Sequence, residues 1–121
     1  MTSTVILYHN PNCSKSRAAL LLLQVRNVDT KVVPYLTEPL DVDQIRNLKE
    51  KLAINSVRQM MRSKDTLYSQ LQLDQADEDA LIAAMAAHPI LIERPIVVLG
   101  DRAAIGRPLT NIEALLENNV N

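Results

Sequence analysis

The chain of 121 residues has no phenylalanine or tryptophan, only two glycines, and a single cysteine. Without these aromatic rings, its core must be aliphatic. One cysteine excludes a disulfide within the chain and favours a reducing compartment. The longest apolar run, residues 18–23, is far shorter than the roughly 20 residues that cross a bilayer, and no signal-peptide pattern precedes it. A formal net charge of -1 gives no basic field for nucleic acid or a membrane surface. We therefore expect a cytoplasmic protein that binds neither nucleic acid nor a membrane.

The cysteine, Cys13, lies where an apolar strand pattern at residues 5–8 gives way to a helical pattern at residues 18–25. The sequence Asn10-Pro11-Asn12 turns the chain between them. Backbone N–H groups and the dipole at a helix N-terminus stabilise an anion, so a thiol there has a lowered pKa and is a better nucleophile. The alternative is that Cys13 is a small buried hydrophobic residue, as free cysteines often are.

Residues 40–88 have helical periodicity throughout and are expected to form a helical insertion. The sequence marks helix starts at Asp41 with Gln44, at Ser56 with Gln59, and at Asp77. Residues 66–73 either continue the helix that opens at Ser56 or form a separate turn. His88 ends the insertion before Pro89, where it interacts with the dipole of the helix that opens at Asp77.

Strand patterns flank this insertion. Residues 30–36 predict a second strand, at the edge of the sheet because Pro34 cannot donate to a ladder. The apolar run at residues 90–99 is interrupted by Glu93-Arg94-Pro95 and turns back at Gly100-Asp101 into residues 102–105. Thr110 with Glu113 forms a third capping box before the last helix. The order β-α-β, helical block, β-β-α predicts one α/β domain over residues 1–121, with a thioredoxin-like fold and a mixed four-stranded sheet.

In thioredoxin-like folds a cis-proline precedes the third strand and faces the reactive cysteine, and Pro95 stands at this place. A cis X–Pro bond costs only about 0.5–1 kcal/mol, so we expect the Arg94–Pro95 bond to be cis; a trans proline at a bulge is the alternative. The redox motif of the fold, Cys-x-x-Cys, is Cys13-Ser14-Lys15-Ser16 here. Because the second thiol is missing, turnover through a sulfur intermediate requires an outside thiol such as glutathione.

The two histidines give a limited signal. His9, four residues before Cys13, either acts as a base or positive neighbour of the thiol or satisfies the strand end. A zinc site of Cys13, His9 and His88 has no matching ligand spacing, so we expect no metal.

The arginines are more informative. Arg94 interrupts an apolar strand directly before Pro95, Arg107 follows the returning strand, and Arg62 follows the helix that opens at Ser56. Three guanidinium groups around a thiolate would bind a tetrahedral oxyanion by charge-assisted hydrogen bonds. The sequence suggests that these three side chains converge on Cys13.

Four motifs together resemble the ArsC family of glutathione- and glutaredoxin-dependent arsenate reductases. They are His9-Asn10-Pro11-x-Cys13, Ser56-Val57-Arg58-x-x-x-Arg62, His88-Pro89-Ile90-Leu91-Ile92-x-Arg94-Pro95-Ile96-Val97-Val98 and Arg107-Pro108. The resemblance covers nearly the whole chain. Arsenate reductases of this family have Gly-Thr-Ser after the cysteine, whereas Ser14-Lys15-Ser16 is similar to the YfgD-type branch.

The resemblance implies that Cys13 attacks arsenate, that His9 and Ser16 help to activate the thiol, and that an oxyanion is bound by a set of arginines, Arg62, Arg94 and Arg107. It also implies a covalent Cys13–arsenate intermediate, glutathione as co-substrate, glutaredoxin as partner, and no bound cofactor.

Two other hypotheses remain. A glutathione-dependent thiol-disulfide oxidoreductase uses the same Cys13 but does not need the arginines. A regulator that binds a protein partner, like the related Spx proteins, is a third possibility, although the missing second cysteine removes their disulfide switch.

Overall fold

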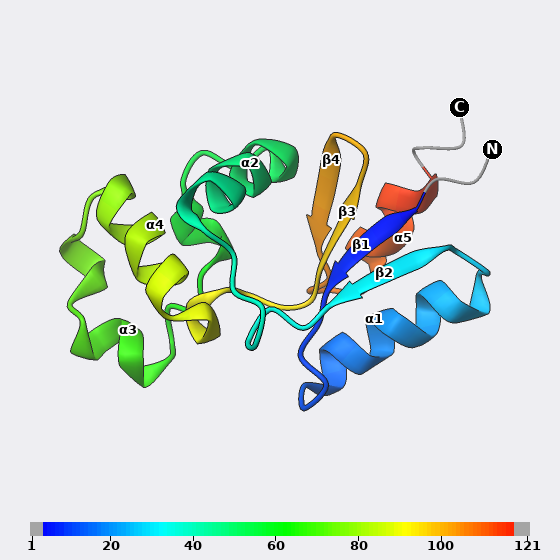
Figure 1. Ribbon diagram of the computed structural model, residues 1–121, viewed down its shortest axis with the longest axis horizontal. Coiled ribbons are helices and arrows are strands. Elements are labelled where there is room, and N and C mark those ends of the chain that lie inside the picture. Colours follow the sequence, from blue (N-terminus) through cyan, green and yellow to red (C-terminus); the bar gives the residue numbers. More distant parts are fainter. Residues whose placement is uncertain (1–3, 118–121) are drawn as a thin grey trace. The chain divides into compact units, whose positions relative to one another are not determined.

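The computed structural model describes residues 4–117 (Figure 1). Its elements are, in chain order, β1 (Val5–Tyr8), α1 (Ser14–Val25), β2 (Thr30–Val33), α2 (Val42–Leu52), η1 (Val57–Met60), α3 (Thr66–Gln70), η2 (Leu73–Gln75), α4 (Glu78–Ala87), η3 (Pro89–Leu91), β3 (Ile96–Leu99), β4 (Arg102–Ile105) and α5 (Thr110–Glu117). Within residues 4–117, no helix is both long enough and apolar enough to cross a membrane.

The chain divides into two units. The sheet unit comprises residues 4–38 and 94–117, and the helical unit comprises Pro39–Glu93. That the two units make one domain stays a prediction. The α/β class and the thioredoxin-like order of elements are confirmed, since β1-α1-β2 and β3-β4-α5 flank a block of helices.

The sheet unit is built on one mixed sheet in the strand order β2-β1-β3-β4. β1 pairs in parallel with β2 and antiparallel with β3, and β3 pairs antiparallel with β4 across the predicted Gly100-Asp101 turn. Strand β2 lies at an edge, as expected, but it ends at Val33. Pro34 belongs to the turn that follows the strand. Its carbonyl accepts hydrogen bonds from the N–H groups of Thr37 and Glu38, at 3.0 and 2.9 Å.

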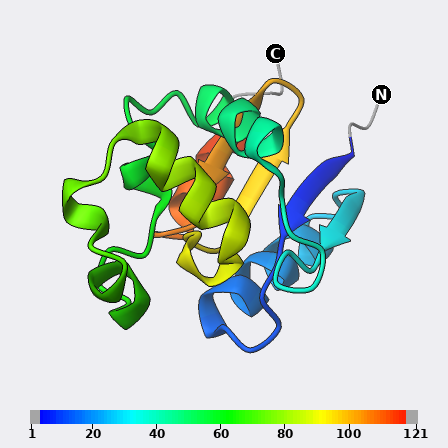
Figure 2. The ribbon, with the colours of Figure 1, turned by 60° about the vertical axis from the view of Figure 1, so that its left-hand side comes forward.

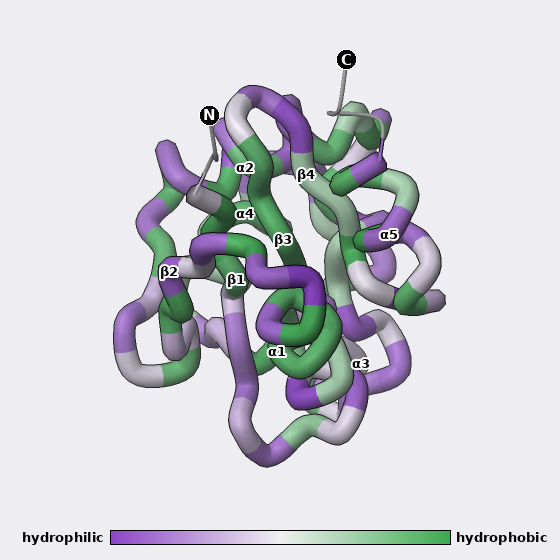
Figure 3. The backbone as a smooth tube through the Cα atoms, turned by 90° about the vertical axis from the view of Figure 1, so that its right-hand side faces the viewer, coloured by the Kyte–Doolittle hydropathy of each residue, from purple (hydrophilic) through white to green (hydrophobic). Residues whose placement is uncertain are grey.

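One face of this sheet carries the aliphatic core, to which both helices of the unit contribute. β3 is hydrophobic along its whole length (Figure 3). Alternate residues of β1 and β3 pack with α1 and α5 in a cluster of buried side chains: Val5, Leu7, Ala19, Leu23, Val97, Leu99, Ile112 and Leu115. Burying an aliphatic side chain contributes about 1.5–3 kcal/mol, so this cluster fixes α1, and the cysteine at its start, against the strands.

In the helical unit, α4 packs against α2, η1 and η3 (Figure 2). The expected caps are present. The Asp41 carboxylate accepts from the Gln44 N–H while the Gln44 side chain accepts from the Asp41 N–H, and Ser56 forms the same reciprocal pattern with Gln59. Asp77 accepts from the Ala80 N–H at 2.9 Å. α3 is a separate helix rather than a continuation of η1, because Asp65 caps it anew.

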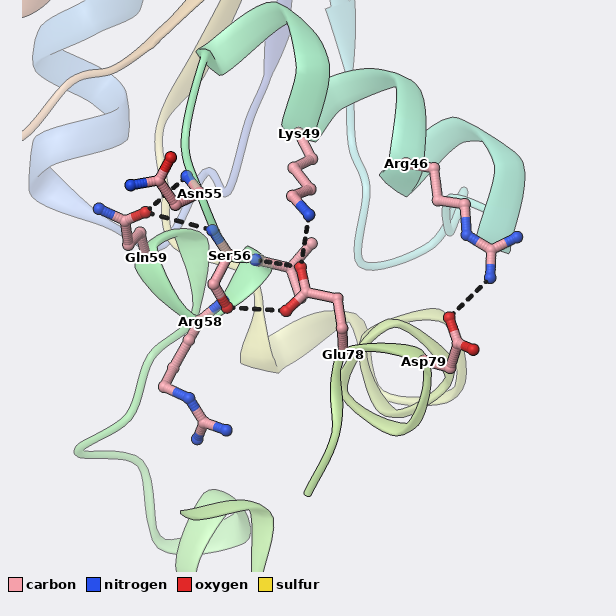
Figure 4. Close-up of polar contacts among 9 residues, drawn as sticks. Arg46, Lys49, Asn55, Ser56, Arg58, Gln59, Glu78 and Asp79 are labelled. Carbon is pink, nitrogen blue, oxygen red and sulfur yellow. Dashed lines mark hydrogen bonds and ion pairs between the residues drawn. The ribbon is translucent and has the colours of Figure 1, made fainter. Parts of the chain in front are cut away.

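A single carboxylate, that of Glu78 at the start of α4, joins three elements of the helical unit (Figure 4). It accepts hydrogen bonds from the Ser56 hydroxyl and the Val57 N–H, both at 2.8 Å. It also forms an ion pair with Lys49, whose Nζ atom lies 2.9 Å away. Burial alone would raise the pKa of Glu78, but these donors lower it below its ordinary value. The carboxylate therefore fixes the start of η1 to α2 and α4.

Candidate active site around Cys13

Cys13 is the N-cap residue of α1, with an extended backbone at φ −102° and ψ 123°. The preceding turn forms as expected from its asparagines. The Cys13 N–H donates to the Asn10 carbonyl, and the Asn12 N–H donates to Asn10 Oδ1, both at 3.0 Å. α1 begins at Ser14, four residues before the start suggested by its apolar residues, because the polar residues 14–17 form its first turn. The helix start thus lies at the cysteine itself.

The Cys13 thiol is largely buried, with 9% of the residue exposed. Burial alone would raise the pKa of this thiol. The backbone N–H groups of Ser16 and Lys15, and the positive charges of Arg94 and Arg107, outweigh that effect, so the pKa of Cys13 is lowered. Cys13 is therefore both buried and a thiol of lowered pKa, two properties that the sequence analysis treated as alternatives.

Arg107 approaches the thiol directly. Its Nη2 atom lies 3.6 Å from Cys13 Sγ, and its Nε atom donates to the Arg94 carbonyl at 2.7 Å. The Arg94–Pro95 peptide bond is cis, in agreement with the sequence-based expectation, and Pro95 is buried. The Arg107–Pro108 bond is also cis, which the sequence did not lead us to expect. Arg94 and Arg107 thus each precede a cis-proline, and both act on the thiol electrostatically.

His9 and Ser16 form a buried pair beside the cysteine. His9 Nδ1 lies 2.6 Å from Ser16 Oγ, and the same hydroxyl accepts from the Asn10 N–H at 3.0 Å. Burial and the positive charge of Arg17 lower the pKa of His9, which favours the neutral imidazole. Ser16 thus connects the residues that follow β1 to the first turn of α1.

Arg62 belongs to the helical unit, where its Nη1 atom lies 3.5 Å from the Asp65 carboxylate. Its convergence on the thiol stays a prediction. Arg58, in the same motif, has a structural role. Its guanidinium donates to the Leu73 and Ala76 carbonyls, at 2.9 and 3.0 Å, and to the Tyr68 hydroxyl.

Among residues 4–117 no three His, Cys, Asp or Glu side chains are placed to hold a metal ion. The sheet unit instead combines a thioredoxin-like fold, one thiol of lowered pKa at a helix start, and arginines beside it. These features define a class of single-cysteine thioredoxin-like proteins whose site attracts anions.

Comparison with known proteins narrows that class. The model of the ArsC family matches residues 8–115. An arsenate reductase of Neisseria meningitidis serogroup A is 53% identical over 112 residues, covering 91% of this chain and 96% of the relative. The Escherichia coli protein YfgD is 49% identical over 110 residues, covering 89% and 92%. The chain belongs to the ArsC family.

The fold agrees with that assignment. A solved structure described as an arsenate reductase from Vibrio cholerae superposes with a TM-score of 0.89 at 46% identity, covering 93% of this chain and 98% of that one.

Proposed function

We propose that this protein is an arsenate reductase that uses Cys13 as its nucleophile and glutathione with glutaredoxin as its reductant. One observation carries the proposal: a thiol of lowered pKa has an arginine nitrogen 3.6 Å from its sulfur. A thiolate is the nucleophilic form of cysteine, and a guanidinium binds tetrahedral oxyanions by charge-assisted hydrogen bonds. The relatives described as arsenate reductases supply the substrate class.

In the first step the Cys13 thiolate attacks arsenic. A sulfur–arsenic bond forms, one arsenate oxygen leaves as water after taking up protons, and arsenic stays pentavalent. Arg94 and Arg107 neutralise the charge of the remaining oxygens, and Arg62 completes this set in our proposal. Preorganised charges act strongly in such a site because they need no rearrangement during the reaction.

His9 and Ser16 position the nucleophile. Their hydrogen bond orients the first turn of α1, whose Ser16 and Lys15 N–H groups stabilise the thiolate. Because the pKa of His9 is lowered, its imidazole is neutral near pH 7, and His9 holds Ser16 without competing as a cation for the oxyanion.

In the second step a glutathione thiolate attacks the Cys13 sulfur of the adduct. A sulfur–sulfur bond forms, and the sulfur–arsenic bond breaks with its electron pair left on arsenic. As(V) is thereby reduced to As(III) and leaves as arsenite. Cys13 then carries a mixed disulfide with glutathione, which a glutaredoxin thiolate cleaves by taking up the glutathionyl group. An outside thiol is required because the chain has no second cysteine.

Arsenite production in the presence of arsenate, glutathione and glutaredoxin tests the proposal. We expect turnover by the parent protein and none above background by Cys13→Ala. Replacing Arg94 with Ala should weaken oxyanion binding by about 1.5–3 kcal/mol, the contribution of a charged hydrogen bond. Equal arsenite production by the parent and Cys13→Ala would contradict the proposal.

A second candidate is glutathione-dependent thiol-disulfide exchange on protein mixed disulfides, because the lowered pKa of Cys13 suits that reaction as well. Substituting Arg62, which is not among the groups that lower the pKa of Cys13, separates the two activities. Arsenate reduction should fall sharply in this variant, whereas deglutathionylation should survive if the protein is mainly an exchange catalyst.

A further inference from the structure

A pocket of about 270 Å³ opens within the sheet unit. It is lined by the first turns of α1, through Lys15 and Ala18, and by the loop between β4 and α5, through Gly106, Arg107, Pro108 and Leu109. Its volume is somewhat below the 300–1,000 Å³ typical of small-molecule sites. It therefore suits a small ligand or part of a peptide-sized one.

The lining has a distinct chemistry. Lys15 and Arg107 are cationic, Ala18, Pro108 and Leu109 are apolar, and none of the six lining residues is acidic. A ligand that matches this lining has a carboxylate at one point and a short uncharged stem. Lys15 is exposed, so its long flexible stem can bring the ammonium group to a carboxylate at the mouth of the pocket.

One residue of the lining also approaches the reacting sulfur. Arg107, which lines the pocket, has its Nη2 atom 3.6 Å from Cys13 Sγ, and the Lys15 N–H is one of the groups that stabilise the thiolate. A ligand that contacts Arg107 in the pocket is therefore one side chain away from the sulfur.

We propose that this pocket binds the tripeptide of glutathione, with the Lys15 ammonium group paired to a glutathione carboxylate and the peptide stem packed on Ala18, Pro108 and Leu109. The assignment rests on the proposed function, which makes glutathione the co-substrate. It gives Lys15 a role in selecting a carboxylate-bearing thiol over a smaller neutral one. Bound in this way, the glutathione sulfur approaches Cys13 from the pocket.

Direct binding provides the first test. S-methylglutathione cannot react, and its binding requires neither arsenate nor turnover. In NMR titrations of the parent protein we expect shifts of the Ala18, Gly106 and Leu109 amides. Lys15→Gln should weaken binding about twofold to fivefold, as expected for losing one exposed ion pair. Lys31→Gln, which removes the same charge from the exposed strand β2, is the matched control and should bind like the parent.

Turnover provides the second test. We expect Lys15→Gln to lower the ratio of kcat/KM for glutathione to that for 2-mercaptoethanol about twofold to fivefold, because the smaller thiol has no carboxylate. Ala18→Leu, which fills the pocket on a helix that accepts leucine, should lower the ratio further while the far-UV circular dichroism stays that of the parent. An unchanged ratio in both variants would overturn the proposal.

The outcomes separate this proposal from the function on which it rests. Shifts of the pocket amides without arsenate reduction would support the pocket and contradict the reductase. Arsenate reduction by glutathione, with shifts elsewhere or equal binding by Lys15→Gln, would contradict the pocket alone. If inorganic phosphate shifted the pocket amides as much as S-methylglutathione does, the glutathione proposal would also be overturned, because the pocket would then be a general anion site.

Discussion

The Nη2 atom of Arg107 lies 3.6 Å from the Sγ atom of Cys13, although 94 positions separate the two residues in the sequence. The contact depends on the loop after β4, where the Arg107 Nε atom donates to the Arg94 carbonyl. The same loop lines the pocket of the sheet unit. One arginine thus connects the nucleophile, the strand that follows Pro95 and the proposed glutathione site.

Removing Arg107 should make the thiol less reactive. Because the guanidinium charge lowers the pKa of Cys13, Arg107→Ala should raise that pKa. The alkylation rate by iodoacetamide, which follows the thiolate fraction, should reach its plateau at a higher pH than in the parent. Arg26→Ala removes an equal charge from an exposed ion pair with Glu113, and its pH profile should match that of the parent. Coinciding profiles for Arg107→Ala and the parent would show that the arginine does not act on the thiol.

The folded protein should lose stability in mild acid through His9. The pKa of His9 is lowered by burial and by Arg17, so the unfolded chain binds a proton at this residue more readily than the folded one. Its contribution is fully present above the unfolded pKa of about 6.5 and is lost as the pH falls through the folded pKa. Urea unfolding between pH 5 and 8 should show stability rising with pH, with a smaller slope in His9→Gln. An unchanged slope in His9→Gln would contradict this account of His9.

The two glycines should respond differently to alanine. A Cβ atom at Gly106 would lie 2.6 Å from Ile112 Cδ1 and 2.8 Å from Pro95 Cγ, so Gly106→Ala must displace buried neighbours, at a cost of about 1–3 kcal/mol. Gly100 has a φ of +63° and open space around it, so Gly100→Ala adds only backbone strain of about 1–2 kcal/mol. We expect Gly106→Ala also to slow alkylation of Cys13, because displacing Pro95 moves the adjacent Arg94, whose charge lowers the pKa of the thiol. Unaltered alkylation in Gly106→Ala would contradict that coupling.

In the helical unit Glu78→Ala should cost about 2 kcal/mol, because it removes the acceptor of the Ser56 hydroxyl and the Val57 N–H. The neighbouring Asp79 shares the first turn of α4 and pairs with Arg46. Both side chains of that pair are exposed, so Asp79→Ala should cost less than about 1 kcal/mol. Thermal unfolding of both variants measures the difference. Equal losses would indicate that the Glu78 carboxylate contributes only its charge at the helix start.

Local signals predicted most of the fold. The strand at Val5–Tyr8 and the hairpin at Gly100 follow from residue patterns that need no tertiary context, and the Asp41, Ser56 and Asp77 caps follow from side chains that bond their own backbone. The errors lie at element ends. α5 begins at Thr110 itself, whereas a capping box would place Thr110 just before the helix.

The site was less accessible from the sequence because its contacts are long-range. The reactivity of Cys13 was predicted from a helix start, which is local. The approach of Arg107 and the second cis-proline at Pro108 depend on how the β4–α5 loop returns to α1. The link between His9 and Ser16 spans seven residues and a turn, and only the family resemblance pointed to Ser16. The sequence thus identified the residues of the site more readily than it predicted the contacts between them.

The most direct test of the account is a crystal structure of the protein soaked in arsenate. We expect continuous density from Cys13 Sγ to arsenic, with arsenate oxygens hydrogen-bonded to the guanidinium groups of Arg94 and Arg107. The same structure will show whether Arg62 reaches the anion. Arsenate bound elsewhere, with Cys13 unmodified at a pH where its thiolate is alkylated readily, would contradict the proposal that this thiol and these arginines form an oxyanion-reducing site.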